Sequence, residues 1–126
     1  MRGILLFGHG ARNAEWRTPF DRIAASIQAL QPTVKVAMGF LELMRPTFDE
    51  AVEVLVAAQA SEIVVVPIFM AAGSHVRKDL PLMAAAAMDR HAGLRIVLAA
   101  PVGESSDVIQ AMAVYALSPI VGQESD

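Results

Sequence analysis

The chain has 126 residues, no cysteine and a formal net charge of −3 at pH 7. This length suits one domain with a single hydrophobic core. The lack of cysteine excludes disulfides, thiolate catalysis, iron–sulfur clusters and thiolate-bound zinc, so any metal must be bound through nitrogen and oxygen. The negative charge argues against non-specific binding to nucleic acid.

The sequence is unusually apolar, with 55% hydrophobic and 18% charged residues. Excess apolar surface is normally buried, so we expect a second copy of the chain to cover part of it in a homodimer. No apolar run reaches the roughly 18 residues of a membrane span, and the first residues lack the pattern of a signal peptide. We therefore expect a cytoplasmic protein.

Strand-like apolar runs alternate with helical patterns along the whole chain. The predicted strands lie at 4–7, 34–40, 62–70 and 94–100, and the predicted helices begin at Thr18, Thr47, Pro81 and Ser105 or Ser106. This alternation predicts an α/β fold of the flavodoxin-like kind, a three-layer sandwich in which helices flank a four-stranded parallel sheet. We expect one domain over residues 1–120 and a frayed tail at 121–126.

Capping residues mark where two of the helices begin. Thr18 precedes Pro19 and is the predicted N-cap of the first helix, with the proline in the first turn. Thr47 and Glu50 match a capping box, in which each side chain accepts a hydrogen bond from the other residue's backbone amide. These signals predict helices that follow the first and second strands.

Prolines indicate where other elements end or begin. Pro67 cannot donate a ladder hydrogen bond, so it should lie near the end of the third strand or beside a bulge. Pro81 is expected in the first turn of a helix that ends near Arg90 and Gly93. Pro119 is predicted to end the last helix. The predicted apolar face of that helix is formed by Val108, Ile109, Met112, Tyr115 and Leu117.

His9 lies between two glycines immediately after the first strand. In open α/β sheets, ligands bind in the crevice at the carboxyl edge of the strands. Flanking glycines allow a sharp bend and a close approach of the ligand. The alternative is a histidine that merely hydrogen-bonds to a neighbouring loop. Trp16, further along this loop, is expected to pack in the ordinary way and not to line the mouth of the crevice.

Three predicted loops bring possible metal ligands to this edge. His9 follows the first strand, Glu42 the second and His75 the third. Two imidazoles and a carboxylate suit divalent cobalt, nickel, iron or zinc in an open site that can release its metal. We expect His9 and His75 to converge on one cleft, with Glu42 facing it. His91 is expected to be an exposed residue in the last turn of a helix, favoured there by the helix dipole.

Cationic side chains gather in the same loops of an acidic chain. These are Arg12, Arg45, Arg77 and Lys78. Their position favours an anionic substrate, although loops can also be charged without binding anything. Apolar residues share the neighbourhood, namely Leu41, Met44, Phe69 and Met70. A ligand with a flat apolar body and a carboxylate fringe would match both sets, with Met44 and Met70 beside the body.

The sequence resembles the small class II tetrapyrrole chelatases, and within them the sirohydrochlorin cobalt or iron chelatases. The similar segments are LFGHGAR at 6–12, FLE at 40–42 and GSHVRKDLP at 73–81. Ala11 stands where relatives commonly have serine, and the fourth loop, at 101–107, lacks a histidine found in some relatives. The resemblance covers the chain from the first strand to the third helix.

The resemblance implies a fold equal to one half of a long chelatase and insertion of cobalt, iron or nickel into sirohydrochlorin on the way to cobalamin or siroheme. It implies a homodimer in which His9 and His75 bind the incoming metal. Glu42 would accept pyrrole protons or complete the coordination shell, and Arg12, Arg45 and Arg77 would orient the substrate's carboxylates. No organic cofactor is required.

Two other functions fit the same residues. A histidine phosphatase carries Arg-His-Gly after its first strand, but here Gly8 replaces the phosphate-binding arginine. A non-catalytic metal or tetrapyrrole binding module would keep the pocket and bind its ligand without turnover. A cobalt-dependent change in the absorbance of sirohydrochlorin distinguishes a chelatase from both.

Overall fold

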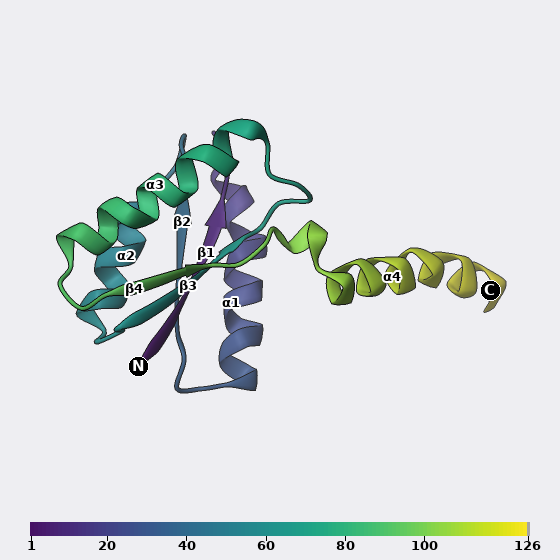
Figure 1. The fold of residues 1–126 in the computed structure, drawn as a ribbon. Helices are drawn as coiled ribbons and strands as arrows, with labels where there is room; N and C mark the ends of the chain where they lie inside the picture. The colour runs from purple at the N-terminus through teal and green to yellow at the C-terminus, as the bar shows by residue number, and fades with distance from the viewer. Residues whose placement is uncertain (126) are drawn as a thin grey trace.

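The structure is a computed structural model that describes residues 1–125, with side chains described for residues 1–119. Four parallel strands form one sheet in the order β2-β1-β3-β4 (Figure 1). The strands are β1 (Arg2–Gly8), β2 (Lys35–Phe40), β3 (Glu62–Pro67) and β4 (Arg95–Leu98). The predicted four-stranded parallel sheet is confirmed.

Strand β1 lies inside the sheet, paired with β2 on one side and β3 on the other. Phe7, near its end, is in register with Gly39 of β2 and Pro67 of β3. All carboxyl ends therefore meet at one edge of the sheet. This topology places the segments that carry His9, Glu42 and His75 at that edge, as predicted.

Helices cover both faces of the sheet. They are η1 (Ala14–Arg17), α1 (Thr18–Leu30), α2 (Phe48–Ala57), α3 (Ser74–Arg90), η2 (Val102–Glu104) and α4 (Ser106–Ser125). The larger core joins α2 and α3 to one face, around Leu5, Phe7 and Val65. The smaller core joins α1 to the other, around Leu6 and Phe40. The three predicted layers are confirmed. None of the described helices has both the length and the apolar character of a membrane span.

The predicted N-cap of the first helix is wrong. Thr18 is already helical, and Arg17 precedes it without a side-chain cap, because η1 runs directly into α1. Pro19 does lie in the first turn, where its missing N–H leaves no bond unmade. The capping box of Thr47 and Glu50 at the start of α2 is confirmed.

Helix α3 begins seven residues before the predicted start at Pro81, at Ser74. Leu80 is buried and Val76 packs against the larger core, together with Ala84 and Ala87 on the same helix face. Burial of this face outweighs the hydrogen bond that Pro81 cannot donate within the helix. His75 therefore belongs to the first turn of a helix and not to a loop.

Strand β3 ends at Pro67 and not at the predicted Met70. The N–H of Ile68 still donates to the carbonyl of Phe7, but β1 ends one residue later, so pairing has no partner to continue with. Pro67 does lie at the end of its strand, as predicted. Strand β4 is likewise shorter than the predicted 94–100.

Helix α4 continues through Pro119, so the predicted end at that residue is wrong. The fixed φ of proline is compatible with a helix, and the cost is the hydrogen bond to the carbonyl four residues earlier. The predicted frayed tail at 121–126 falls on residues whose side chains lie outside the described part of the chain. Figure 1 shows α4 extending away from the sheet and the other helices.

Candidate functional site

Backbone hydrogen bonds join the loop after β1 to the loop after β2. The N–H of Leu41 donates to the carbonyl of Gly8 at 2.9 Å, and the N–H of Glu42 donates to the carbonyl of His9 at 3.1 Å. Gly10 has φ +99°, and a Cβ at this position would lie 1.8 Å from the carbonyl oxygen of Glu42. Only glycine allows this approach. The two loops therefore form one unit.

This unit brings His9 and Glu42 together. Nε2 of His9 lies 3.5 Å from Oε1 of Glu42, and the two side chains are 59% and 52% exposed. At this distance the carboxylate attracts a protonated imidazole, while both groups remain open to solvent and to a ligand. The pair offers one nitrogen and one carboxylate donor side by side.

An apolar pocket of about 340 Å³ opens beside His9. It lies toward α1, and its walls are His9, Gly10, Ala11, Trp16, Pro19, Phe20, Phe40, Ile68 and Phe69. Four of these are aromatic, which suits a flat apolar ligand. Two of these rings, Phe20 and Phe40, pack edge to face with their centroids 5.0 Å apart.

Trp16 lines this pocket and is 62% exposed, so the expectation of ordinary packing is wrong. It lies on η1, which buries none of its residues. Asn13 fixes η1 by accepting a hydrogen bond from the N–H of Glu15 at 2.9 Å. The sequence placed Phe69 at this edge but gave no sign that Phe20 and Phe40 join it, because these residues come from segments far apart in the chain. The short distance in sequence from His9 to Trp16 was the available signal.

His75 is exposed in the first turn of α3 and does not line this pocket. Within the described residues, no three His, Asp or Glu side chains lie close enough together to hold a metal ion. One copy of the chain thus pairs His9 with Glu42, while the convergence of His75 with them stays a prediction.

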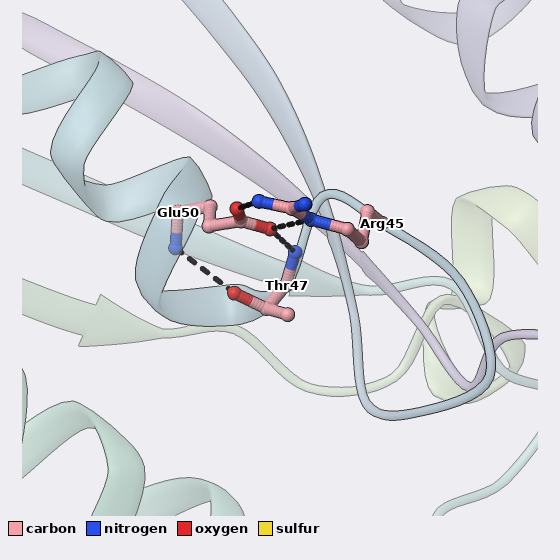
Figure 2. A network of polar contacts seen from close by, with 3 residues as sticks. All are labelled: Arg45, Thr47 and Glu50. Atoms are coloured by element: carbon pink, nitrogen blue, oxygen red, sulfur yellow. Dashed lines mark hydrogen bonds and ion pairs between the residues drawn. The ribbon is translucent and has the colours of Figure 1, made fainter.

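Arg45 is bound to Glu50 by two guanidinium nitrogens, one of them Nε at 3.1 Å from Oε1. Figure 2 shows the same carboxylate accepting from the backbone of Thr47, whose hydroxyl accepts from the N–H of Glu50. The hydrogen bonds from Arg45 and then from Thr47 lower the pKa of Glu50 to about 2. The same pairing raises the pKa of Arg45. This arginine supports the start of α2.

The other predicted cations have different surroundings. Arg77 donates to the carbonyl of Ala72 at 3.0 Å and to Glu104 at 3.2 Å. Arg12 is exposed and, within the described residues, has no hydrogen-bond or ion-pair partner. Arg12 is therefore the one among the three predicted arginines whose charge is not already engaged by a carboxylate.

The two predicted methionines lie on different sides of the site. Met44 is half-buried against the smaller core, and its sulfur lies 3.4 Å from the N–H of Ala11. Met70 is exposed, and its carbonyl lies against Gly103, where a Cβ would approach to 1.9 Å. Met44 thus supports the His9 loop, and Met70 joins the segments after β3 and β4.

His91 is not exposed as predicted, since its side chain is only 16% exposed. It occupies the C-cap of α3, and its extended backbone turns the ring toward α2, where Nε2 lies 2.9 Å from Oε1 of Glu53. Arg90 binds Asp49 nearby at 2.8 Å. These pairs join α3 to α2, away from the pocket.

Comparison with known proteins finds sirohydrochlorin cobaltochelatases among the relatives of this chain. The chain is 34% identical to the sirohydrochlorin cobaltochelatase of Sulfolobus acidocaldarius, over 94% of both chains. It is 37% identical over 83 residues to that of Methanopyrus kandleri, of which it covers 58%. Several of these relatives are thus longer than the part that the chain matches.

Solved structures agree. A CbiX protein from Marinobacter aquaeolei, described as a putative cobalamin biosynthesis protein, superposes with a TM-score of 0.79 at 29% identity, covering 95% of this chain and 98% of that one. The sirohydrochlorin chelatase SirB of Bacillus subtilis, solved with cobalt, gives 0.74 at 29% identity, covering 87% of this chain and 47% of SirB. The sequence model of the CbiX family matches residues 3–115. The chain is therefore a member of the CbiX family.

Proposed function

We propose that this chain is a sirohydrochlorin chelatase, a lyase that inserts divalent cobalt or iron, with nickel as a further candidate ion, during the synthesis of cobalamin or siroheme. The observation that carries the proposal is the His9–Glu42 pair at the rim of an aromatic pocket. The names of the relatives in sequence and structure support it.

Metal insertion requires that two pyrrole N–H protons leave the ring and that the metal loses water. Neutral His9 would supply a nitrogen ligand to the incoming metal through Nε2, and Glu42 would receive a proton from the ring. Their side chains are more than half exposed, so the metal reaches them from solvent. His75 would be the second nitrogen ligand.

The pocket suits part of a tetrapyrrole. Its volume of about 340 Å³ lies at the lower end for small-molecule sites, so one edge of the macrocycle enters while the rest stays outside. Trp16 and Phe69 would contact the ring, with Met44 and Met70 at the margins. The carboxylates would then face Arg12, and Arg45 and Arg77 after release from Glu50 and Glu104.

The proposal includes a homodimer in the cytoplasm, with no nucleic-acid or membrane partner. An edge of the macrocycle that protrudes from a shallow pocket needs a second wall, and a second copy of the chain can supply it. Small apolar chains of this kind commonly bury their excess surface against themselves.

The test follows cobalt insertion into sirohydrochlorin by absorbance, with and without the protein. The wild type should accelerate insertion, and Glu42→Gln, which keeps the size of the side chain but cannot accept a proton, should slow it at least about 100-fold. The matched control is Glu53→Gln on α2, which loses only the contact with His91. Equal rates with and without the wild-type protein would leave a binding module and refute the chelatase.

A further inference from the structure

Helix α4 is an apolar helix without a matching surface in its own chain. Residues 108–119 include no charged side chain. Among the described residues, α4 contacts η2 at its root and makes no comparable contact with a strand or another helix. Its large side chains are exposed, with Tyr115 at 75%. A helix that is apolar on all sides is normally buried.

The sheet has an apolar strip at β3 and β4 that the described helices leave open. We call the side chains of Val64 and Val97, bordered by Val66 where it packs against the smaller core, the β3–β4 strip. Val64 and Val97 are register partners and belong to neither core cluster, and Val97 is 36% exposed. They face the side of α1, but α1 lies over β2, at the opposite end of the sheet. Among the described residues, no helix packs over β3 and β4 on this face of the sheet.

The root of α4 is held in an outward direction. The N–H of Gly103 donates to the carbonyl of Phe69, and Glu104 binds Arg77. Ser105 then caps the helix, with its hydroxyl 3.4 Å from the N–H of Val108. Because η2 is anchored on both sides, α4 leaves the body at a fixed point beside the site and extends away from the sheet of its own chain (Figure 1).

We propose that α4 is an exchanged arm: the α4 of each copy packs on the β3–β4 strip of a second copy of this chain. The exchange is reciprocal, so both helices are buried by one two-fold symmetric contact. A 20-residue helix is about 30 Å long and about 10 Å wide. Each α4 would bury an area of this length and width on itself and the same area on its partner. The two contacts together would bury about 1,200 Å² of surface, which is enough for a stable dimer.

The absence of charge over residues 108–119 of α4 matches the strip, because Val64 and Val97 are both apolar. The arm also starts beside the site, because Glu104 at its root binds Arg77 two residues from His75. Exchange therefore brings the two sites of a dimer toward the same interface. The inference goes beyond the proposed activity and is tested without any tetrapyrrole.

The first test measures mass by light scattering. The wild type should give twice the 13.4 kDa of one chain at micromolar concentration. Val114→Lys on α4 and Val97→Lys on the strip should each raise the dissociation constant at least about tenfold. Val54→Lys is the matched control, since Val54 on α2 is as exposed as Val114, at 58% and 56%, and should leave the dimer intact. A monomeric wild type, or a dimer that both α4 and strip variants leave unchanged, would overturn the exchange.

A second test does not depend on disruptive variants. The chain has no cysteine, so Val97→Cys and Met112→Cys introduce the only thiols. A short bis-maleimide should join two chains when one carries each substitution, and a chain with both should give a covalent dimer on a denaturing gel. An internal cross-link within a monomer would show that α4 folds onto its own strip and would refute the exchange. Cross-linking only between two copies of the same substituted position would indicate that two α4 helices pair with each other, and this would also refute the exchange.

Discussion

The two faces of the sheet are covered very differently. On one face, α2 and α3 bury Leu5, Phe7 and Val65 completely in a continuous core. On the other, α1 alone covers β1 and β2, and the pocket and the β3–β4 strip remain open. The comparison indicates a division of roles, with stability concentrated on the face of α2 and α3 and binding surfaces on the face of α1.

The strongest test of this division replaces one side chain on each face. Phe7→Ala should lower the free energy of unfolding by about 3–5 kcal/mol, because Phe7 packs edge to face with both Phe48 and Phe69. Ile23→Ala on α1 should cost about 1–2 kcal/mol, since this side chain is only partly buried. Urea denaturation measures both. Equal losses would show that the α1 face contributes as much stability as the other.

The histidines separate activity from stability. His9→Ala and His75→Ala should each slow cobalt insertion at least about 100-fold, with little change in the melting temperature, because both side chains are exposed. The double variant should be little slower than either single one, since the two residues would act on the same metal.

The control for these variants lies on the opposite face. His91→Ala should insert cobalt at the wild-type rate and lose about 1 kcal/mol of stability with the Glu53 contact. Near-normal insertion by both His9→Ala and His75→Ala would remove the metal-site proposal. A loss of insertion in His91→Ala would mean that the two faces do not divide the roles as described.

Gly10 tests how strictly the site depends on its two joined loops. Gly10→Ala places a methyl group against the Glu42 carbonyl at a positive φ, so it should cost about 1–3 kcal/mol and separate His9 from Glu42. Gly73→Ala is the matched control, because a Cβ there meets nothing within 4 Å. The melting temperature and the insertion rate should both fall in Gly10→Ala and stay at the wild-type values in Gly73→Ala. Wild-type insertion by Gly10→Ala would show that the pair is dispensable.

The smallest expected effect is the contribution of Glu50 to stability at acidic pH. Its pKa is about 2 in the folded protein against an ordinary 4.5, so its pairing stabilises the fold above about pH 4.5 and this contribution is lost as pH falls toward 2. Glu50→Gln should therefore lose less stability than the wild type between pH 5 and pH 2. Added salt should reduce the difference, because the pair is exposed. Identical acid profiles in urea denaturation would contradict the assignment.

Much of the fold could be predicted because local signals and tertiary packing agree. Local signal and packing agree in three places: the strand residues Ile4 to Phe7, the capping box of Thr47 and Glu50, and the helix residues Phe20 to Leu30. Predictions were wrong where packing overrode a local signal. Pro81 resembles a helix start, but burial of Leu80 extends α3 backwards over His75.

The site was predictable in part for the same reason. Parallel strands of one sheet bring their carboxyl ends to the same edge. The approach of Glu42 to His9 could therefore be predicted from the order of strands and loops along the sequence. The pairing of Arg45 with Glu50 and the exposure of Trp16 could not, because each depends on side-chain geometry that sequence spacing does not determine. The exposure of α4 could not be predicted either, because its apolar pattern resembles that of a helix packed on its own sheet.

The inner position of β1 has a consequence for the order in which the chain folds during synthesis. Its two neighbours, β2 and β3, are both complete by Pro67, and α1 and α2 lie between them in sequence. The three-stranded unit can thus form while α4 is still within or near the ribosome. Exchange of the arm would then be the last event, and the only step whose rate depends on how many copies of the protein the cell has already made.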